Sequence, residues 1–339
     1  MQPYKARVIR DLIGKSRRIF KIPVYQRNYD WKNTQCKKLF EDILKAYDKD
    51  KDHFMGTMVY LKITDSSQLE EVLIIDGQQR ITSVYILLKA LYDYAKKEEN
   101  YKLEDIIKDY LFNKKCEENQ KLKLKPIKSD NEQLNYLMKN ELEELSKESN
   151  IYQNYILFDN LIEEALSKNY TIEDILEGIE KLEVVEIVLD NSQGDEAQII
   201  FESINSTGLE LSVADLIRNY LLMDDKKQEF LFEEYWLKIE KMIGYDNLEE
   251  FFLHFLNSKL SDVISSKNIY QKFKIYYEKN FKNHEEILLL LKKYAYYYSA
   301  FIGKNKKYSV EINECLNSFS MINQTTIYPF LLLLFDDFE

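Results

Sequence analysis

The sequence predicts an α+β protein, with a small mixed unit at the N-terminus followed by a larger, mainly α-helical part. Runs rich in β-branched residues are concentrated in the first 76 residues and recur at residues 181–190. Most of the remaining chain has apolar residues at three- and four-residue spacing, which is typical of amphipathic helices. Glycine (8) and proline (4) are scarce among the 339 residues, which favours long helices with few tight turns.

The first hundred residues contain three β-rich runs and two helical patterns. Residues 17–31 open as a strand and then become polar and aromatic at "YQRNYDW", and residues 34–49 follow with helical spacing. Two further β-rich runs, at residues 53–63 and 69–76, flank a polar turn. The pattern then predicts an amphipathic helix over residues 82–97.

The rest of the chain is predicted to be helical, with two short returns to β-structure. A short alternating strand ends at Pro126, and residues 181–190 alternate again, so we expect the chain to rejoin the sheet there. Helical patterns cover residues 131–180, 195–205, 212–224 and 225–339. We therefore expect a first unit over residues 1–115 that is completed by 181–222, a helical insertion over 116–180 and a helical domain over 223–339.

Charge is unevenly distributed along the chain. The net charge is −11, yet residues 1–40 hold eleven basic side chains against two acidic ones, a net charge of +9. The remaining residues hold 36 basic against 56 acidic side chains, a net charge of −20. A basic segment on an acidic body can attract phosphates locally while the chain avoids indiscriminate DNA binding. Ordinary solvated surface charge is the alternative explanation.

Sorting and cysteine patterns favour a cytoplasmic protein without membrane contact. The N-terminal segment has no apolar signal-peptide core. The longest apolar run, "IYPFLLLLF", is far shorter than the roughly 20 residues of a membrane-spanning helix. Cys36, Cys116 and Cys315 are widely separated, which predicts reduced thiols and no zinc site.

A glycine, two glutamines and an arginine stand where a buried strand meets a helix, in the stretch "IIDGQQRIT". The first turn of a helix has unpaired N–H groups and a positive dipole end, so it can bind an anion. Gly77 would let the backbone approach a ligand, and Arg80 could form a bidentate pair with phosphate oxygens. Gln78 and Gln79 could hydrogen-bond a base, a ribose or an attacking water.

The two remaining polar residues of this stretch have several candidate roles. Asp76 could hold Mg²⁺ or cap the turn, and Thr82 could cap the helix or touch a phosphate or metal. The stretch lacks the G-x-x-x-x-G-K-[ST] pattern of a Walker A loop. Taken alone, it could also be an ordinary strand-to-helix connection with an exposed arginine.

Two further stretches favour a ligand site over an ordinary strand-to-helix connection. "IPVYQRNYDW" places Gln26 and Arg27 just after a strand, and "FESINSTGLELSVADLIRN" carries Asn205 and Gly208 in a tight connection. Together with "HFMGTMVYL" and "DGQQRITSV", and in the same order over residues 22–219, these stretches resemble the N-terminal domain of the GmrSD-type modification-dependent restriction endonucleases.

The resemblance implies a nucleotide-binding unit similar to the ParB and sulfiredoxin fold. It would bind and hydrolyse an NTP, either GTP or ATP, with Mg²⁺, as a regulatory or sensor module in the restriction of modified phage DNA. ParB-type motifs often have an acid at the position of Gln78, so a metal role does not carry over to that side chain. Carried over by position, the catalytic candidates are Asp76, Gln78 and Gln79. The nucleotide-binding candidates are Gln26, Arg27, Gly77, Arg80, Thr82, Asn205 and Gly208.

The implied partners are a nucleotide, DNA and an HNH-type nuclease domain or subunit, and a homodimer is left open. No HNH domain is recognisable, because His53, His254 and His284 are isolated and form no metal-binding arrangement. We therefore expect no metal site and no DNA cleavage by this chain alone. Its last residues stop inside a helical pattern, which suggests a truncated chain or a natural sensor half.

The basic N-terminal stretch is predicted to contact DNA. Side chains alternate faces along a strand, so Arg17 and Lys21 should share one face and Arg18 should lie on the other. One face would meet the nucleotide phosphates and the other a DNA backbone. A solvated edge strand that its charges protect from aggregation is the alternative.

Other functions stay open at this point. One is a non-hydrolysing module that binds modified DNA, and another is a toxin–antitoxin or scaffold component with a vestigial nucleotide site. The connection from Asn205 to Ser212 is too long for a helix-turn-helix, which disfavours that motif. The tyrosine-rich patterns at residues 270–281 and 291–301 could stack on bases, but their spacing favours helix packing.

Overall fold

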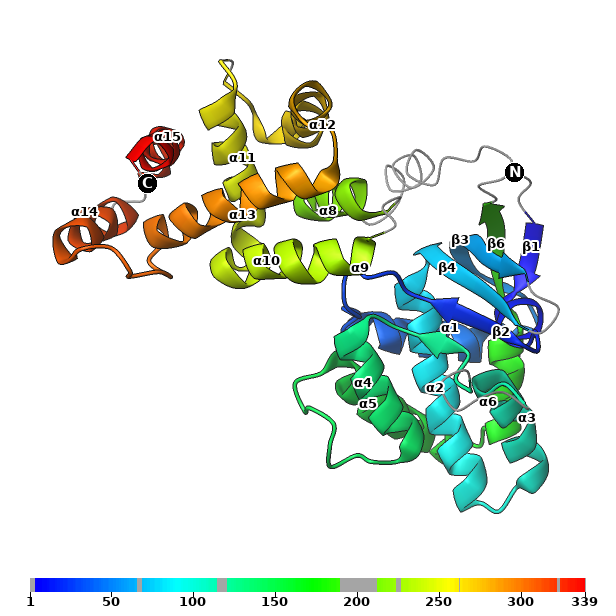
Figure 1. Cartoon of the computed structure of the whole chain (residues 1–339). Coiled ribbons are helices and arrows are strands. Elements are labelled where there is room, and N and C mark those ends of the chain that lie inside the picture. The colour runs from blue at the N-terminus through cyan, green and yellow to red at the C-terminus, as the bar shows by residue number, and fades with distance from the viewer. Residues whose placement is uncertain are drawn as a thin grey trace. The chain divides into compact units, whose positions relative to one another are not determined.

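The computed structural model contains two compact units, residues 1–201 and residues 202–339 (Figure 1). The first has a mixed sheet with helices and the second is helical, which confirms the predicted α+β class. No described helix is long and apolar enough to cross a membrane. The structure describes residues 4–65, 69–114, 121–189, 212–223, 227–261, 263–321 and 324–338.

The first unit is built on a six-stranded sheet with the strand order β1-β6-β3-β4-β2-β5. The residues expected to rejoin the sheet form β6, which lies antiparallel to β1 and parallel to β3. β2 lies between β4 and β5 and is parallel to both. The strands span Tyr4–Arg7 (β1), Arg18–Lys21 (β2), His53–Asp65 (β3), Glu70–Asp76 (β4), Leu124–Lys125 (β5) and Leu182–Leu189 (β6).

Helices α1 to α6 lie together on one side of this sheet (Figure 1). α2 is the central helix and packs against α3, α5 and α6, and its residues from Val84 to Leu88 have no exposed surface. α2 begins at Gln78, four residues earlier than predicted. The helices span Asn33–Asp48 (α1), Gln78–Lys97 (α2), Tyr101–Leu111 (α3), Lys128–Lys139 (α4), Asn150–Ser167 (α5) and Ile172–Glu180 (α6), and a π-helix spans Val8–Ile13.

The second unit is held together by aromatic side chains. Trp236 stacks on Phe252, and Phe255 meets Tyr294 edge to face. Tyr294 and Tyr298 are fully buried, so the tyrosine-rich helices pack together as expected. The helices span Val213–Leu222 (α8), Gln228–Leu231 (α9), Leu237–Ile243 (α10), Leu248–Lys259 (α11), Ile269–Asn280 (α12), His284–Phe301 (α13), Val310–Met321 (α14) and Tyr328–Phe338 (α15), with a π-helix at Phe232–Trp236.

The predicted domain boundaries stay a prediction, but two packing facts bear on them. α8, which the prediction placed with the first unit, packs on α11 and α12 in the second. The helices of the predicted insertion are integral to the first unit, because α5 packs on both α1 and α2, and α6 packs on α1.

Candidate functional site at the start of α2

The start of α2 is largely buried, and Gln78 and Gln79 in its first turn are each 7% exposed. Gly77 precedes it with φ +96°, a left-handed conformation that favours glycine. No side chain caps the helix, and its first described ladder bond runs from Ile81 N–H to the Gly77 carbonyl at 3.1 Å. Within the described part of the chain, the N–H groups of Gln78, Gln79 and Arg80 donate no hydrogen bond. Unpaired N–H groups at a helix start are the donors that an anion site of the predicted kind would use.

The Arg80 guanidinium is engaged with the protein itself. It donates to the Met55 carbonyl at 3.1 Å and to the Thr57 carbonyl at 2.6 Å, and its ion pair with Asp76 measures 2.9 Å. Both side chains are half-buried. The alternative of an exposed arginine is therefore wrong, because Arg80 ties the start of α2 to β3. Asp76 likewise shares its carboxylate with Arg80.

Gly56 makes the contacts of Arg80 with β3 possible, and the sequence analysis did not predict it as a site residue. Its φ is +110°, and a Cβ there would lie 2.2 Å from an Arg80 guanidinium nitrogen. The pairing of β3 with β6 shifts register at this point, between Phe54 and Thr57. A glycine inside a β-rich run indicates a bulge or a close backbone approach, so the "HFMGT" segment did carry a signal.

Gln26 and Gln78 form a buried amide pair. The Gln78 amide N–H donates to the Gln26 carbonyl oxygen at 3.2 Å, and the Gln26 amide donates to the Ile75 carbonyl at 3.0 Å. The pair joins the first motif to the end of β4 and the start of α2, as predicted for residues of one site. No described hydrogen bond uses the side-chain oxygen of Gln78, which can therefore accept one from a ligand or a water.

Gln79 has a different role from its neighbour. Its side-chain oxygen accepts from the N–H groups of Asp30 at 2.7 Å and Trp31 at 3.2 Å, and its amide donates to the Asn28 carbonyl at 2.9 Å. These three bonds hold residues 28–31, called the clamped loop below. A side chain used in this way cannot also orient an attacking water, so the predicted catalytic role of Gln79 does not fit its geometry.

Arg27 directly precedes the clamped loop and is one of the cations of the predicted nucleotide site. It is half-buried, and in the described part of the chain its guanidinium has no hydrogen bond and no ion pair. It follows Gln26, which contacts Gln78 at the start of α2. An arginine in this state can offer its planar array of donors to phosphate oxygens.

Residues 9–222 match the family described as GmrSD restriction endonuclease, N-terminal domain. The match covers more than half of the 339 residues. The chain belongs to this family. No curated protein matches it significantly.

Two of the nucleotide-site residues that the GmrSD resemblance implied lie outside the described residues, namely Asn205 and Gly208. Thr82 is described, and its predicted ligand contact stays a prediction. It is 1% exposed, its hydroxyl lies in the interior without a hydrogen-bond partner, and it does not cap α2.

The basic strand of this GmrSD-family chain departs from the prediction in its details. Arg18 is 3% exposed, and its guanidinium pairs with Glu70 at 2.6 Å and lies 3.9 Å from Glu186, so it cannot reach a DNA backbone. Lys21 points to the other face, as alternation requires, but pairs with Glu71 at 2.7 Å. Arg17 is exposed and precedes β2 with φ +59°, so the alternation that should place it with Lys21 does not extend to it.

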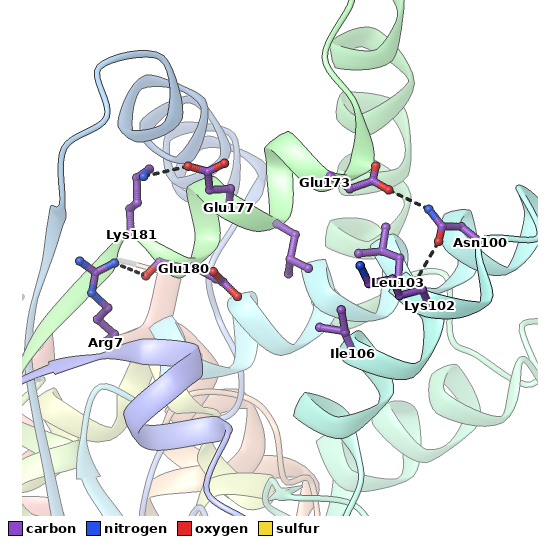
Figure 2. Close-up of a pocket in the computed structure, with 10 residues that line it drawn as sticks. Arg7, Asn100, Lys102, Leu103, Ile106, Glu173, Glu177, Glu180 and Lys181 are labelled. Atoms are coloured by element: carbon purple, nitrogen blue, oxygen red, sulfur yellow. Dashed lines mark hydrogen bonds and ion pairs between the residues drawn. The ribbon is translucent and has the colours of Figure 1, made fainter.

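A cavity of about 490 Å³ lies between the start of the chain, α3 and α6 (Figure 2). Its polar side chains point toward one another: Lys181 pairs with Glu177 at 3.0 Å, and Asn100 donates to Glu173 at 2.7 Å. Its three basic and three acidic side chains balance, so it has no net attraction for phosphate. The charged lining residues are Arg7, Lys102, Lys181, Glu173, Glu177 and Glu180.

A second cavity, of about 630 Å³, is lined by five lysines and only two aspartates. Three of the lysines have no ion pair in the described part of the chain, and each stands in the last turn of α2, α3 or α4. Cations in the last turn of a helix interact favourably with the helix dipole, which is an ordinary structural reason for lysine at these positions. Exposed Arg17 adjoins this cavity, because its N–H donates to the lining residue Asn113 at 3.0 Å. The lysines are Lys96, Lys108, Lys114, Lys121 and Lys139.

Proposed function

We propose that this chain is an NTP-binding and NTP-hydrolysing regulatory module of a DNA restriction system directed against phage. The family supports the restriction role, because it is the N-terminal domain of a restriction endonuclease. The observation that carries the nucleotide role is the uncapped start of α2, whose first three N–H groups have no partner among the described residues, together with the unpaired Arg27. Three free N–H groups, a helix dipole and a guanidinium together suit a phosphate group.

The residues of the site divide into distinct roles under this proposal. Arg27 and the N–H groups of Gln78, Gln79 and Arg80 bind phosphate oxygens. The Gln78 side-chain oxygen orients the attacking water, as a glutamine does in other nucleotide hydrolases. Arg80 acts through its clamp on β3 rather than as a phosphate ligand, since its contacts are already made.

Mg²⁺ fits this site only as a companion of the nucleotide. No group of three or more His, Cys, Asp or Glu in the described part of the chain could hold a metal by itself. Mg²⁺ commonly binds through one or two carboxylates together with substrate phosphates and water, and would neutralise phosphate charge during transfer. Asp76 is the carboxylate of the motif that could contribute, at the expense of its pair with Arg80.

Nucleotide titration of thermal stability tests the binding half of the proposal. GTP and ATP with Mg²⁺ are added to wild type, to Arg27→Ala and to a control, Arg10→Ala, which removes an exposed arginine from the π-helix of residues 8–13. We expect Arg27→Ala to lose about tenfold or more in affinity, since hydrogen bonds to charged groups are worth roughly 1.5–3 kcal/mol. Its melting temperature without nucleotide should not change. Equal affinity in Arg27→Ala and wild type would refute the phosphate role.

Hydrolysis separates this proposal from a non-hydrolysing binding module. Gln78→Ala should bind the nucleotide and release phosphate at least about tenfold more slowly, because an unoriented water loses the positional advantage. A wild-type chain that binds the nucleotide without any turnover would instead support the binding module.

DNA and an HNH-type nuclease domain or subunit are the macromolecular partners that the proposal requires, and a homodimer stays open. The lysine-lined cavity, with Arg17 beside it, is the exposed basic surface that favours DNA contact. DNA affinity measured against salt should show a slope reduced by about 0.9 for each lost phosphate contact. We expect this for Lys108→Ala with Lys139→Ala, but not for the control pair Lys37→Ala with Lys38→Ala on α1. Equal slopes would remove the cavity from DNA binding.

A further inference from the structure

The clamped loop is held by side chains from segments far away in the sequence. Gln79 of α2 binds three of its backbone groups. Asp130 of α4 accepts from the Tyr29 N–H at 2.6 Å, and Asn150 of α5 donates to the Tyr29 carbonyl at 2.9 Å. Asn154, one turn further along α5, donates to the Trp31 carbonyl at 2.7 Å. Six backbone groups between Asn28 and Trp31 are thus fixed by four side chains.

The buried side chain of Tyr29 also holds the clamped loop in place. It is 5% exposed, and its hydroxyl lies 2.6 Å from the Ser83 hydroxyl, 3.3 Å from the Cys36 thiol and 3.1 Å from the Asn154 amide. Ser83 belongs to α2, Cys36 to α1 and Asn154 to α5. The loop is therefore fixed against three helices at once, and Asn154 holds both the hydroxyl of Tyr29 and the backbone of Trp31.

Such extensive clamping is unusual for a short connection. The polar backbone groups of surface loops are ordinarily satisfied by water. Here α4 and α5 supply amides and a carboxylate instead, and burial raises the pKa of the Asp130 carboxyl to about 6 although the hydrogen bond from Tyr29 N–H lowers it. Holding a loop with a partly buried acid costs stability, because burial disfavours the ionised carboxylate. Functional groups, by contrast, gain from being held within fractions of an ångström.

We infer that α4 and α5 form a positioning element for the nucleotide site, in which Asp130, Asn150 and Asn154 hold the clamped loop and, through it, fix the position of Arg27. The inference rests on the proposed nucleotide function and extends it to a segment outside the motif stretches. Arg27 directly precedes the loop, so backbone motion at Asn28 and Tyr29 would also move the Arg27 guanidinium. The three residues act through Arg27 and are not catalytic residues themselves.

The test compares three variants of α4 for binding of GTP and ATP with Mg²⁺. Asp130→Ala removes the acceptor of the Tyr29 N–H, and we expect affinity to fall about tenfold or more. Asp130→Asn keeps an oxygen that can accept the same bond, and should recover most of the affinity. Glu132→Ala removes an exposed acid two residues further along α4 and should bind like wild type. Amide hydrogen exchange of residues 29–31 should be faster in Asp130→Ala alone.

Each outcome decides a separate point. If wild type binds neither nucleotide, the proposed function fails and the inference fails with it. If wild type binds and Asp130→Ala binds equally well, the inference alone is overturned. Faster exchange of the loop amides without loss of affinity also overturns it, because the loop would then be clamped for stability only. Should Asp130→Ala fail to fold, Asn150→Ala, which removes only the bond to the Tyr29 carbonyl, is measured in its place.

Discussion

The start of α2 and strand β2 both place arginines where the sequence predicts contact with phosphates, yet their environments differ. Along β2, Arg18 is buried against Glu70 and Glu186, and Lys21 pairs with Glu71. At the start of α2, three backbone N–H groups have no partner in the described part of the chain, and neither has Arg27 of the first motif. Positive charge is abundant in both regions, but only the second leaves donors free.

The difference shows that net charge along a stretch does not say which cations stay unpaired in the folded chain. The +9 of residues 1–40 contains cations that acidic strands elsewhere in the sequence neutralise once the sheet forms. Glu70 and Glu71 stand opposite Arg18 and Ile19 in the parallel pair of β2 and β4. Charge pairs across strands are set by register, and register is visible only when the strands are aligned.

The largest expected effect comes from breaking the link between α2 and β3. Gly56→Ala places a Cβ 2.2 Å from an Arg80 nitrogen and forces alanine to adopt φ +110°. We expect the free energy of unfolding to fall by about 3 kcal/mol or more, since backbone strain and loss of the Arg80 contacts add together. Denaturant unfolding measures this change.

The matched control is Gly303→Ala in the second unit. That glycine also has a left-handed φ, +74°, but the nearest atom to its added Cβ is 3.8 Å away. It should lose only about 1–2 kcal/mol for the backbone conformation. Equal losses in the two variants would show that the close approach of Arg80 to Gly56 contributes nothing to stability.

The next largest effect distinguishes Arg18 from its neighbour Arg17. Arg18→Ala leaves Glu70 and Glu186 without their buried partner and should cost about 3 kcal/mol, the usual result of breaking a buried ion pair. Its DNA affinity should keep the wild-type salt dependence. Arg17→Ala should be as stable as wild type and should reduce the salt slope by about 0.9. A reduced slope in Arg18→Ala would mean that this buried side chain is released to bind DNA.

The fold was largely predictable because its strands and helices follow local patterns. The β-rich runs at residues 53–63 and 69–76 became β3 and β4, and the alternating residues 181–190 became β6. The start of α2 was predicted too late, because Gln78 and Gln79 carry no apolar signal. A likeness to the ParB and sulfiredoxin fold stays a prediction.

The roles inside the site could be predicted only in part. "DGQQR" and "YQR" correctly indicated two segments that meet, as the bond between Gln78 and Gln26 shows. Nothing local distinguishes Gln78 from Gln79, however, since their partners come from residues about 50 positions away. Asp130 acts on Tyr29 from 101 residues further along the chain, and no motif marks it. Long-range hydrogen bonds are therefore what the sequence could not show.

The smallest expected effect concerns the stability cost of Asp130 and sharpens the contrast with the paired carboxylates of β4. Burial raises the pKa of Asp130 in the folded chain from 3.8 to about 6, so between these values the folded state binds more protons than the unfolded state. The contribution of the protonated Asp130 carboxyl to the free energy of unfolding is therefore fully present below about pH 4. It is lost as the pH rises through about 6.

Asp130→Asn removes this titration while its side-chain oxygen can still accept the bond from Tyr29. Its free energy of unfolding should therefore gain on that of wild type between pH 4 and pH 7, by at most about 3 kcal/mol, because a shift of one pKa unit corresponds to 1.36 kcal/mol and the group is partly solvated. Urea unfolding at several pH values measures the difference, with Glu132→Asn as the control on the same helix. A difference that stays constant with pH would show that Asp130 carries no such cost, and the argument that it is retained for the loop's function would lose its basis.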